Sequence, residues 1–386
     1  MGLQSSRIAA RKDEAIPSRP IITGIGTAWP SLLIGPDSLR DYALKWYSGE
    51  QQWVQDLLRI NGQTGIETRA VLDLWNDSQW HKDQPPTAED VDQAFRVYGT
   101  KLASEAARKA LEESDIRPEE ITHMVAVTAT NAGSPGYDQI VAREIGLSEL
   151  AERLLLSGVG CAGGLAALRV ATDLATAASH RNQKAKILIV ACELCSIQVR
   201  AELHTASRTQ HVGIGPALFG DGAAALILCN NSPGGGEKSR ALYAVTDRRS
   251  RIAPDTHEEM SYQTNNLGFL LHLSKRVPAL AAASVPSVFR DLMMANKMSQ
   301  APADYDWALH PGGLAIIKGV QKAMDIPDHA LRASNEIYKT RGNSSSVAVL
   351  AVLDKLRGMG AGSKNIVACS FGPGLMTEMA LLERLV

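Results

Sequence analysis

Apolar positions follow two spacings along the chain, and their alternation predicts strands and helices that take turns. Short continuous apolar runs indicate strands buried on both faces, as at residues 154–156, 187–191 and 365–368. Apolar residues at steps of three and four, as at Leu165, Leu168 and Ala171, indicate a helix that buries one face. Strands that alternate with helices favour an α/β fold, with a mainly parallel sheet covered by helices.

The same reasoning extends over most of the chain. It predicts strands at residues 21–27, 121–128, 186–191, 223–228, 305–309 and 365–368. It predicts helices at residues 37–58, 100–114, 138–145, 268–294, from 314 onward, and at 346–356. The polar stretch at residues 73–92 is expected to be a long surface loop.

Two segments divide the chain. Pro233 and three consecutive glycines lie within residues 230–239, which predicts a boundary between two halves at residues 21–235 and 236–386. Residues 1–20 hold basic side chains but no apolar core of a secretory signal, so we expect a flexible N-terminal extension.

Composition narrows the class of protein. The 386 residues are 45% hydrophobic and 21% charged, with a net charge of −1, which gives no electrostatic reason to expect a nucleic-acid partner. No apolar run reaches the roughly 18 residues of a membrane span. Five scattered cysteines favour a reducing, cytoplasmic compartment over a disulfide framework. The pair Cys192 and Cys195 lacks further ligands, so no metal site is expected.

Cys161 stands where a predicted strand turns into a helix. Glycines surround it, in the order Gly158-Val159-Gly160-Cys161-Ala162-Gly163-Gly164. A thiol at this turn would face unpaired backbone N–H groups and the positive end of the helix dipole, both of which favour the thiolate. Free cysteines are usually small apolar core residues, so Cys161 is a candidate nucleophile that other motifs must support.

Two further polar residues occupy similar junctions. His310 ends an apolar strand and precedes Pro-Gly-Gly, a sequence that turns the backbone sharply and lets an imidazole project. Asn343 lies in Gly-Asn-Ser-Ser-Ser, before an apolar helix. Alone it would be a helix cap. Cys, His and Asn at three strand and helix junctions would meet at one end of a parallel sheet.

Two chemistries use Cys, His and Asn in this order. Papain-like hydrolysis is one, and the separation between Cys161 and His310 suits it, but the Cys-Gly-Ser/Ala-Cys signature is absent. Decarboxylative Claisen condensation is the other. It uses a thiol as nucleophile and leaving group, and needs no general base for the carbanion, because loss of CO₂ generates it.

The motifs around these residues resemble those of type III polyketide synthases, the chalcone and stilbene synthase family with its fungal relatives. The resemblance covers about residues 20–386 and rests on Gly160-Cys161-Ala162-Gly163-Gly164, Phe219-Gly220-Asp221-Gly222, His310-Pro311-Gly312-Gly313, Gly342-Asn343-Ser344-Ser345 and Phe371-Gly372-Pro373-Gly374. It implies a thiolase fold, five layers αβαβα built from two related halves, in a homodimer. It also implies malonyl-CoA and an acyl-CoA as substrates, with no permanently bound cofactor.

The resemblance also implies roles for single residues. Cys161 would carry the acyl chain, His310 would stabilise its thiolate, and His310 with Asn343 would bind the malonyl thioester carbonyl. Residues implied at the gatekeeper and in the substrate cavity are Phe219, Leu271, Phe269, Cys195, Gln198, Thr130 and Ser345. Residues implied in CoA binding are Arg59, Gly312 and Gly313, and a structural loop is implied at Gly372, Pro373 and Gly374.

Departures from the plant pattern point to the substrate. Leu271 aligns best with the usual second gatekeeper phenylalanine, although Phe269 nearby leaves the register open. A less aromatic gate predicts a fatty acyl starter and a pyrone or resorcinol-type product. The alternatives are a single condensation, as in ketoacyl-ACP synthase type III, and a non-catalytic acyl-CoA-binding relative. The intact Cys161, His310 and Asn343 argue against the latter.

Overall fold

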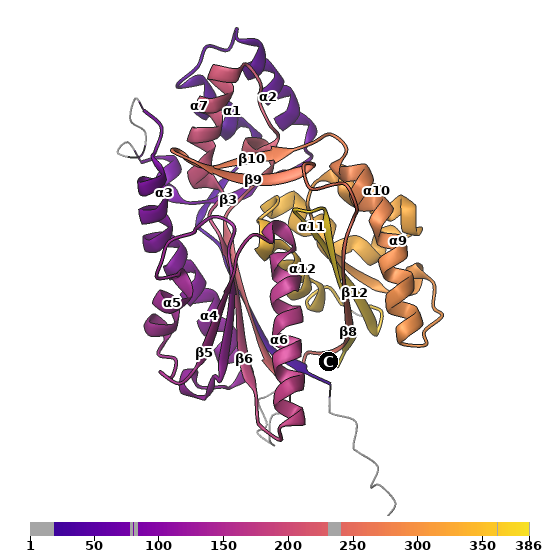
Figure 1. Cartoon of the computed structure of the whole chain (residues 1–386). Helices are drawn as coiled ribbons and strands as arrows, with labels where there is room; N and C mark the ends of the chain where they lie inside the picture. The colour runs from indigo at the N-terminus through magenta and orange to yellow at the C-terminus, as the bar shows by residue number, and fades with distance from the viewer. Residues whose placement is uncertain (1–18, 78–79, 81–83, 231–240, 361, 386) are drawn as a thin grey trace, which may run out of the picture.

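One nine-stranded mixed sheet runs through the computed structural model, which describes residues 19–77, 80, 84–230, 241–360 and 362–385 (Figure 1). Its first part contains, in spatial order, β1 (Ile21–Ala28), β7 (Gly222–Cys229), β6 (Lys186–Glu193), β4 (His123–Val127) and β5 (Glu152–Leu156). Its second part contains β8 (Tyr243–Ile252), β13 (Met376–Arg384), β12 (Asn365–Gly372) and β11 (Asp306–Leu309).

The two parts of the sheet join weakly. β8 pairs with β1 only at Ile21 with Ala244 and at Ile22 with Tyr243. Each part therefore acts as a separate layer. The predicted boundary at residues 230–239, apart from Asn230, and nearly all of the extension at residues 1–20 lie outside the described residues.

Helices fill the space between the layers and cover both outer faces. α6 (Gly163–His180) and α12 (Ala348–Arg357) contact each other and strands of both parts, so they form the middle layer (Figure 1). One outer face is covered by α3 (Ala88–Ala94), α4 (Thr100–Ser114) and α5 (Tyr137–Ile145), and the other by α9 (Val277–Ala295), α10 (Leu314–Met324) and α11 (Arg332–Arg341). The result is the five-layered αβαβα arrangement of the thiolase fold.

A cap of smaller elements lies at one end of these layers. An apolar cluster of its own joins α1 (Pro36–Leu44), α2 (Gln52–Gln63), α7 (Val199–Thr209) and α8 (Gly215–Leu218). Two-stranded ribbons are formed by β2 (Leu32–Ile34) with β3 (Arg69–Val71), and by β9 (Met260–Asn265) with β10 (Gly268–Leu273). Short helical turns are η1 (Asp73–Trp75), η2 (Phe95–Gly99), η3 (Pro118–Glu120), η4 (Gly160–Ala162), η5 (Ser196–Gln198), η6 (Pro302–Asp304), η7 (Asp328–Leu331) and η8 (Ser345–Val347).

Two expectations about the sheet were wrong. The sheet is mixed, because parallel pairing is confined to β4 with β5 and β6 and to β11 with β12. The run at residues 154–156 is not buried on both faces, since β5 is an edge strand whose side chains are largely exposed. A short apolar run does not distinguish a central strand from an edge strand.

Three local expectations also need correction. The helix predicted at residues 37–58 is two helices, broken around Ser48 and Gly49, and the first of them begins at Pro36 with Gly35 as its N-cap. Residues 268–273 form a strand, because β10 pairs with β9 along its whole length. The surface loop expected at residues 73–92 contains η1 and the start of α3.

Candidate active site

Cys161 lies in the turn η4, directly before α6, and the loop after β12 packs against it. Gly160 adopts a φ of +49°, and a Cβ atom there would lie 2.6 Å from Cδ of Pro373. A Cβ atom on Gly372 would lie 2.4 Å from the carbonyl oxygen of Val159. Glycine is therefore required on both sides of this contact. The predicted structural loop at residues 372–374 supports the turn that presents the thiol.

Close helix packing brings Cys161 to a second segment. A Cβ atom on Gly164 would lie 2.4 Å from the carbonyl oxygen of Ser346, and one on Gly163 would lie 3.0 Å from Cβ of Ser346. The first turn of α6 thus touches η8, where the chain runs from Asn343 into α12. Side chains on either segment would separate Cys161 from Asn343.

His310 follows the last residue of β11. Its backbone N–H donates to the carbonyl oxygen of Cys369 at 2.8 Å, which continues the pairing with β12. The side chain is 2% exposed, and no described residue hydrogen-bonds Nδ1. A Cβ atom on Gly312 would lie 3.2 Å from Nε2, so the glycine leaves room beside the imidazole. Burial lowers the pKa of His310 to about 3.

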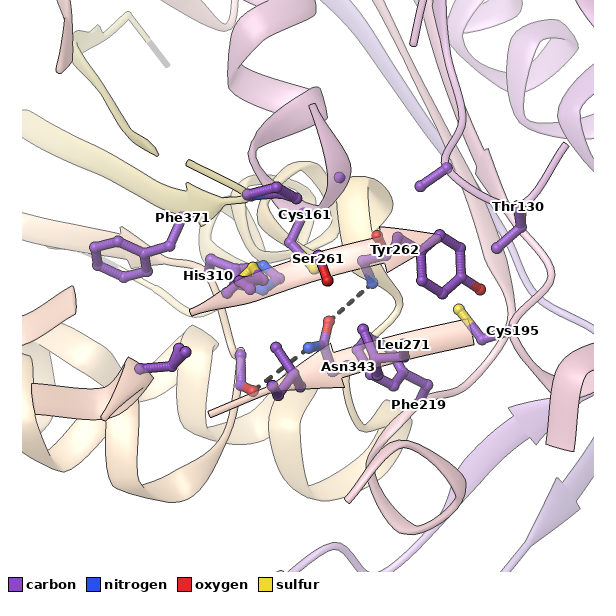
Figure 2. Close-up of a pocket in the computed structure, with 18 of the residues that line it drawn as sticks. Thr130, Cys161, Cys195, Phe219, Ser261, Tyr262, Leu271, His310, Asn343 and Phe371 are labelled. Carbon is purple, nitrogen blue, oxygen red and sulfur yellow. Dashed lines mark hydrogen bonds between the residues drawn. The ribbon is translucent and has the colours of Figure 1, made fainter. Parts of the chain in front are cut away.

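Two contacts fix the side-chain amide of Asn343. Oδ1 accepts the backbone N–H of Ser345 at 2.8 Å, and Nδ2 donates to the carbonyl oxygen of Gly312 at 3.4 Å (Figure 2). The backbone of Asn343 also bonds to Leu218 and Gly220, on either side of Phe219. The amide nitrogen therefore faces the His310 turn, and its long bond to Gly312 is a weak one.

The three side chains open into one pocket. Cys161, His310 and Asn343 come from separate segments and reach the same space, together with Phe219 and Leu271 (Figure 2). The other lining residues are Ala129, Thr130, Gly160, Cys195, Glu202, Met260, Ser261, Tyr262, Leu273, Val277, Gly312, Ile316, Ser345, Phe371 and Pro373. Most of this lining is apolar, which suits a hydrocarbon chain.

Burial governs the ionisation of the Cys161 thiol. It raises the pKa of Cys161 to about 11, and hydrogen bonds with Ser345 and Asn343 lower it by less. Burial therefore opposes the thiolate that the helix terminus is expected to favour. A thiolate here needs a positive partner, because a single buried charge is costly.

The predicted cavity residues divide into two groups. Phe219, Thr130, Cys195, Leu271 and Ser345 line the pocket. Gln198 and Phe269 do not. The Gln198 Oε1 atom accepts the backbone N–H of Phe269 at 3.3 Å, and the ring of Phe269 stacks on Tyr262 with 5.1 Å between ring centroids. Of the two residues considered for the second gatekeeper, Leu271 lines the pocket and Phe269 does not.

The predicted CoA contacts lie at different depths. Gly312 lines the pocket, whereas Gly313 caps α10 with a φ of +153°. Arg59 is exposed on α2 and pairs with Asp56 at 2.9 Å. Arg69 is buried and donates to the carbonyl oxygens of Pro216 and Phe219, so it supports the turn that holds Phe219.

Sequence reasoning missed a buried carboxyl beside the nucleophile. Glu193 ends β6 and accepts hydrogen bonds from the Ala129 backbone, the Thr130 hydroxyl and the Ser346 hydroxyl. Burial raises its pKa. Its position at the carboxyl end of a predicted strand was an available signal. Tyr262 and Glu202 carried no such signal, since the sequence predicted neither the strand β9 nor the cap helix α7 on which they lie.

Two other findings concern the described residues only. Within them, no group of three or more His, Cys, Asp or Glu side chains could hold a metal ion. None of the helices over the same ranges is long and apolar enough to cross a membrane.

Comparison with known proteins places the chain. The chalcone and stilbene synthase N-terminal domain matches residues 9–232, and the C-terminal domain matches residues 245–386. The type III polyketide synthase pspB of Penicillium soppii is 39% identical, over 94% of this chain and 96% of that protein. The acylalkylpyrone synthase csyB of Aspergillus oryzae is 33% identical, over 96% of each.

Solved structures agree. The fungal type III polyketide synthase ORAS superposes with a TM-score of 0.91 at 38% identity, over 95% of this chain and 99% of that one. CsyB complexed with CoA-SH gives 0.91 at 32% identity, over 95% of this chain and 100% of that one. The chain belongs to the chalcone and stilbene synthase family and is a type III polyketide synthase, an enzyme of the acyltransferase class.

Proposed function

We propose that this enzyme extends a fatty acyl-CoA starter with malonyl-CoA by repeated decarboxylative Claisen condensation and closes the chain to a pyrone or resorcinol-type product. The observation that carries the proposal is the meeting of Cys161, His310 and Asn343 in one largely apolar pocket. The roles of these three residues are part of the proposal.

In the first step, Cys161 takes the acyl group. Its thiol proton passes to His310, and the sulfur attacks the carbonyl carbon of the acyl-CoA. The bond from that carbon to the CoA sulfur then breaks, and CoA leaves as a thiol with the proton from His310. Burial disfavours the charged form of each group, as the raised pKa of Cys161 and the lowered pKa of His310 show. When the thiolate and the imidazolium form together, their attraction offsets this cost.

In the second step, malonyl-CoA supplies the carbanion. The His310 N–H and the Asn343 amide N–H donate to the malonyl thioester oxygen, where negative charge collects as CO₂ leaves. The Asn343 amide needs little rearrangement, because its present bond to Gly312 is only a weak one. The enolate carbon attacks the Cys161 thioester, a carbon–carbon bond forms, and the bond to the cysteine sulfur breaks. The extended chain is then on CoA and ready to reload.

The proposed starter class is inferred from the residues that line the pocket, and the proposed product class from a relative. Leu271 stands at the gate and the lining beside it is mostly aliphatic, which supports a fatty acyl chain over an aromatic one. A relative described as an acylalkylpyrone synthase and a CoA-bound neighbour support CoA thioesters as substrates and a pyrone as product. Arg59, Gly312 and Gly313 remain the proposed CoA contacts.

We also propose a homodimer assembled through β5. Among the strands that the structure describes, β5 pairs only with β4, so its other edge offers unpaired backbone groups. Its side chains are exposed and partly apolar, with Leu154 at 38% and Leu155 at 36%, and Leu150 just before it is 90% exposed. An antiparallel pairing of two β5 strands would cover these groups around a two-fold axis.

A starter series separates this function from its alternatives. Purified enzyme is incubated with malonyl-CoA and acyl-CoA starters of increasing length, without carrier protein, and products are identified by mass spectrometry. Pyrones or resorcinols from medium or long starters support the proposal. Products from p-coumaroyl-CoA alone would contradict the starter class, and a single condensation that needs carrier protein would support the ketoacyl-ACP synthase alternative.

A further inference from the structure

Glu202 is a carboxyl group inside the pocket that the proposed chemistry does not use. It lies on α7, and its side chain reaches the pocket space beside Cys195 and Tyr262. A Cβ atom on Gly215 would lie 2.4 Å from Oε2 of Glu202 and 3.1 Å from Cδ2 of Leu271. The carboxyl therefore sits next to the gate residue Leu271.

The carboxyl of Glu202 differs from the two fully buried carboxyls near the site, because Glu202 is only partly buried and lines the pocket. Glu193 accepts hydrogen bonds from Ala129, Thr130 and Ser346, and Asp221 accepts them from Leu72 and Ser196. Glu202 has neither an ion pair nor a hydrogen bond with any residue that the structure describes. Burial alone raises its pKa to about 8. At neutral pH the group is protonated, and its O–H is a donor without an acceptor.

The position of this donor relative to the nucleophile is informative. Cys195, Tyr262 and Leu271 lie on one side of Asn343, whereas Phe371 lies on the other side, beyond His310 (Figure 2). A chain attached to Cys161 that turns toward Cys195 and Tyr262 comes within the surroundings of Glu202. A fully alkyl chain there would leave the O–H unsatisfied, whereas a chain with oxygen atoms would satisfy it.

We propose that Glu202 is a positioning residue whose carboxyl donates a hydrogen bond to a keto oxygen of the poly-β-ketoacyl chain held on Cys161. This inference rests on the proposed function and names the intermediate that its pocket recognises. The contact becomes available only after extension has added keto groups, so it favours the longer intermediates. It also fixes how the chain lies before ring closure.

Two variants test the contact. Glu202→Gln keeps a donor of nearly the same shape, and Glu202→Leu removes it at similar volume. Each full-length enzyme is given hexanoyl-CoA and malonyl-CoA, and the ratio of tetraketide to triketide products is measured by mass spectrometry. The loss of one hydrogen bond to a neutral group predicts a ratio about 5- to 10-fold lower in Glu202→Leu. The ratio in Glu202→Gln stays within about twofold of wild type, because the amide retains a donor.

The pH dependence adds a readout that a purely structural role would not move. Above about pH 8 the wild-type carboxyl loses its proton, and its product ratio falls toward that of Glu202→Leu. The ratio of Glu202→Gln does not follow. Cys195 and Tyr262 are the titratable groups that face Glu202, and burial raises the pKa of both, so neither ionises over this range.

The outcomes separate the two levels of the proposal. A wild-type enzyme that forms no condensation product overturns the proposed function and this inference with it. If the wild type is active and Glu202→Leu gives the same ratio of tetraketide to triketide, the inference is overturned and the proposed function stands. The inference is also overturned if Glu202→Gln and Glu202→Leu lose the longer product equally, because a retained donor must retain the effect.

Discussion

The contact between Gly164 and Ser346 sets the distance between the nucleophile and the Asn343 turn, and a single methyl group tests it. Gly164→Ala places a Cβ atom 2.4 Å from the carbonyl oxygen of Ser346, whereas ordinary contact begins at 3.4 Å. The two segments must separate by the difference, 3.4 − 2.4 = 1.0 Å. A displacement of about 1 Å between reacting groups costs on the order of 100-fold in rate. We therefore expect kcat to fall by roughly 100-fold.

Stability should respond much less than activity. Alanine in place of glycine within a helix stabilises the folded state by about 1 kcal/mol, and crowding of a packed interior destabilises it by about 1–3 kcal/mol. The net loss in unfolding free energy is then about 0–2 kcal/mol, which leaves the variant folded. Urea unfolding measures this loss, and steady-state product formation measures kcat.

Gly62→Ala is the matched control. Gly62 lies in α2, and a Cβ atom there would have nothing within 4 Å. This variant should gain about 0.5–1 kcal/mol in unfolding free energy and keep wild-type kcat. If Gly164→Ala also kept wild-type kcat, the close approach of α6 to η8 would not control the site, and the reasoning would fail.

Four further changes have defined outcomes. Cys161→Ala should abolish product formation and the acyl-enzyme mass while Tm stays within about 2 °C of wild type. Leu271→Phe should reduce kcat/KM for long starters about tenfold relative to short ones, measured over a starter series. The pKa of Glu202 is raised from 4.5 to about 8, so between these pH values the folded state keeps a proton that the unfolded state loses. Wild-type stability therefore falls as the pH rises through this range. Because glutamine does not titrate, the Tm of Glu202→Gln relative to wild type should rise from pH 5 to pH 8. Leu155→Lys should convert the proposed dimer to monomer in analytical ultracentrifugation.

Local signals accounted for much of the fold and of the pocket. Cys161, His310 and Asn343 each follow a strand or precede a helix, and that local pattern led us to expect them in one place; all three line one pocket. Their catalytic roles stay a proposal. Strand β10 pairs with β9 in a register that places Leu271 opposite Tyr262, and both residues line the pocket.

Features that depend on distant partners could not be predicted in this way. The exposure of β5 follows from its place at the sheet edge, which no residue within the strand encodes. No sequence pattern predicts which way the Gln198 side chain points. Its hydrogen bond with the backbone of Phe269, on another element, keeps it out of the pocket lining. The environment of Glu202 likewise arises from Gly215, Cys195 and Tyr262, which come together only in the folded chain.

The ribbon of β9 and β10 has a consequence for how such enzymes diversify. It supplies Met260, Ser261, Tyr262, Leu271 and Leu273 to the pocket, yet its strands pair only with each other and not with the nine-stranded sheet. One wall of the reaction chamber can therefore accumulate changes while the layered scaffold stays intact. Grafting residues 260–273 from a relative should transplant chain-length preference as a module, without redesign of the interior.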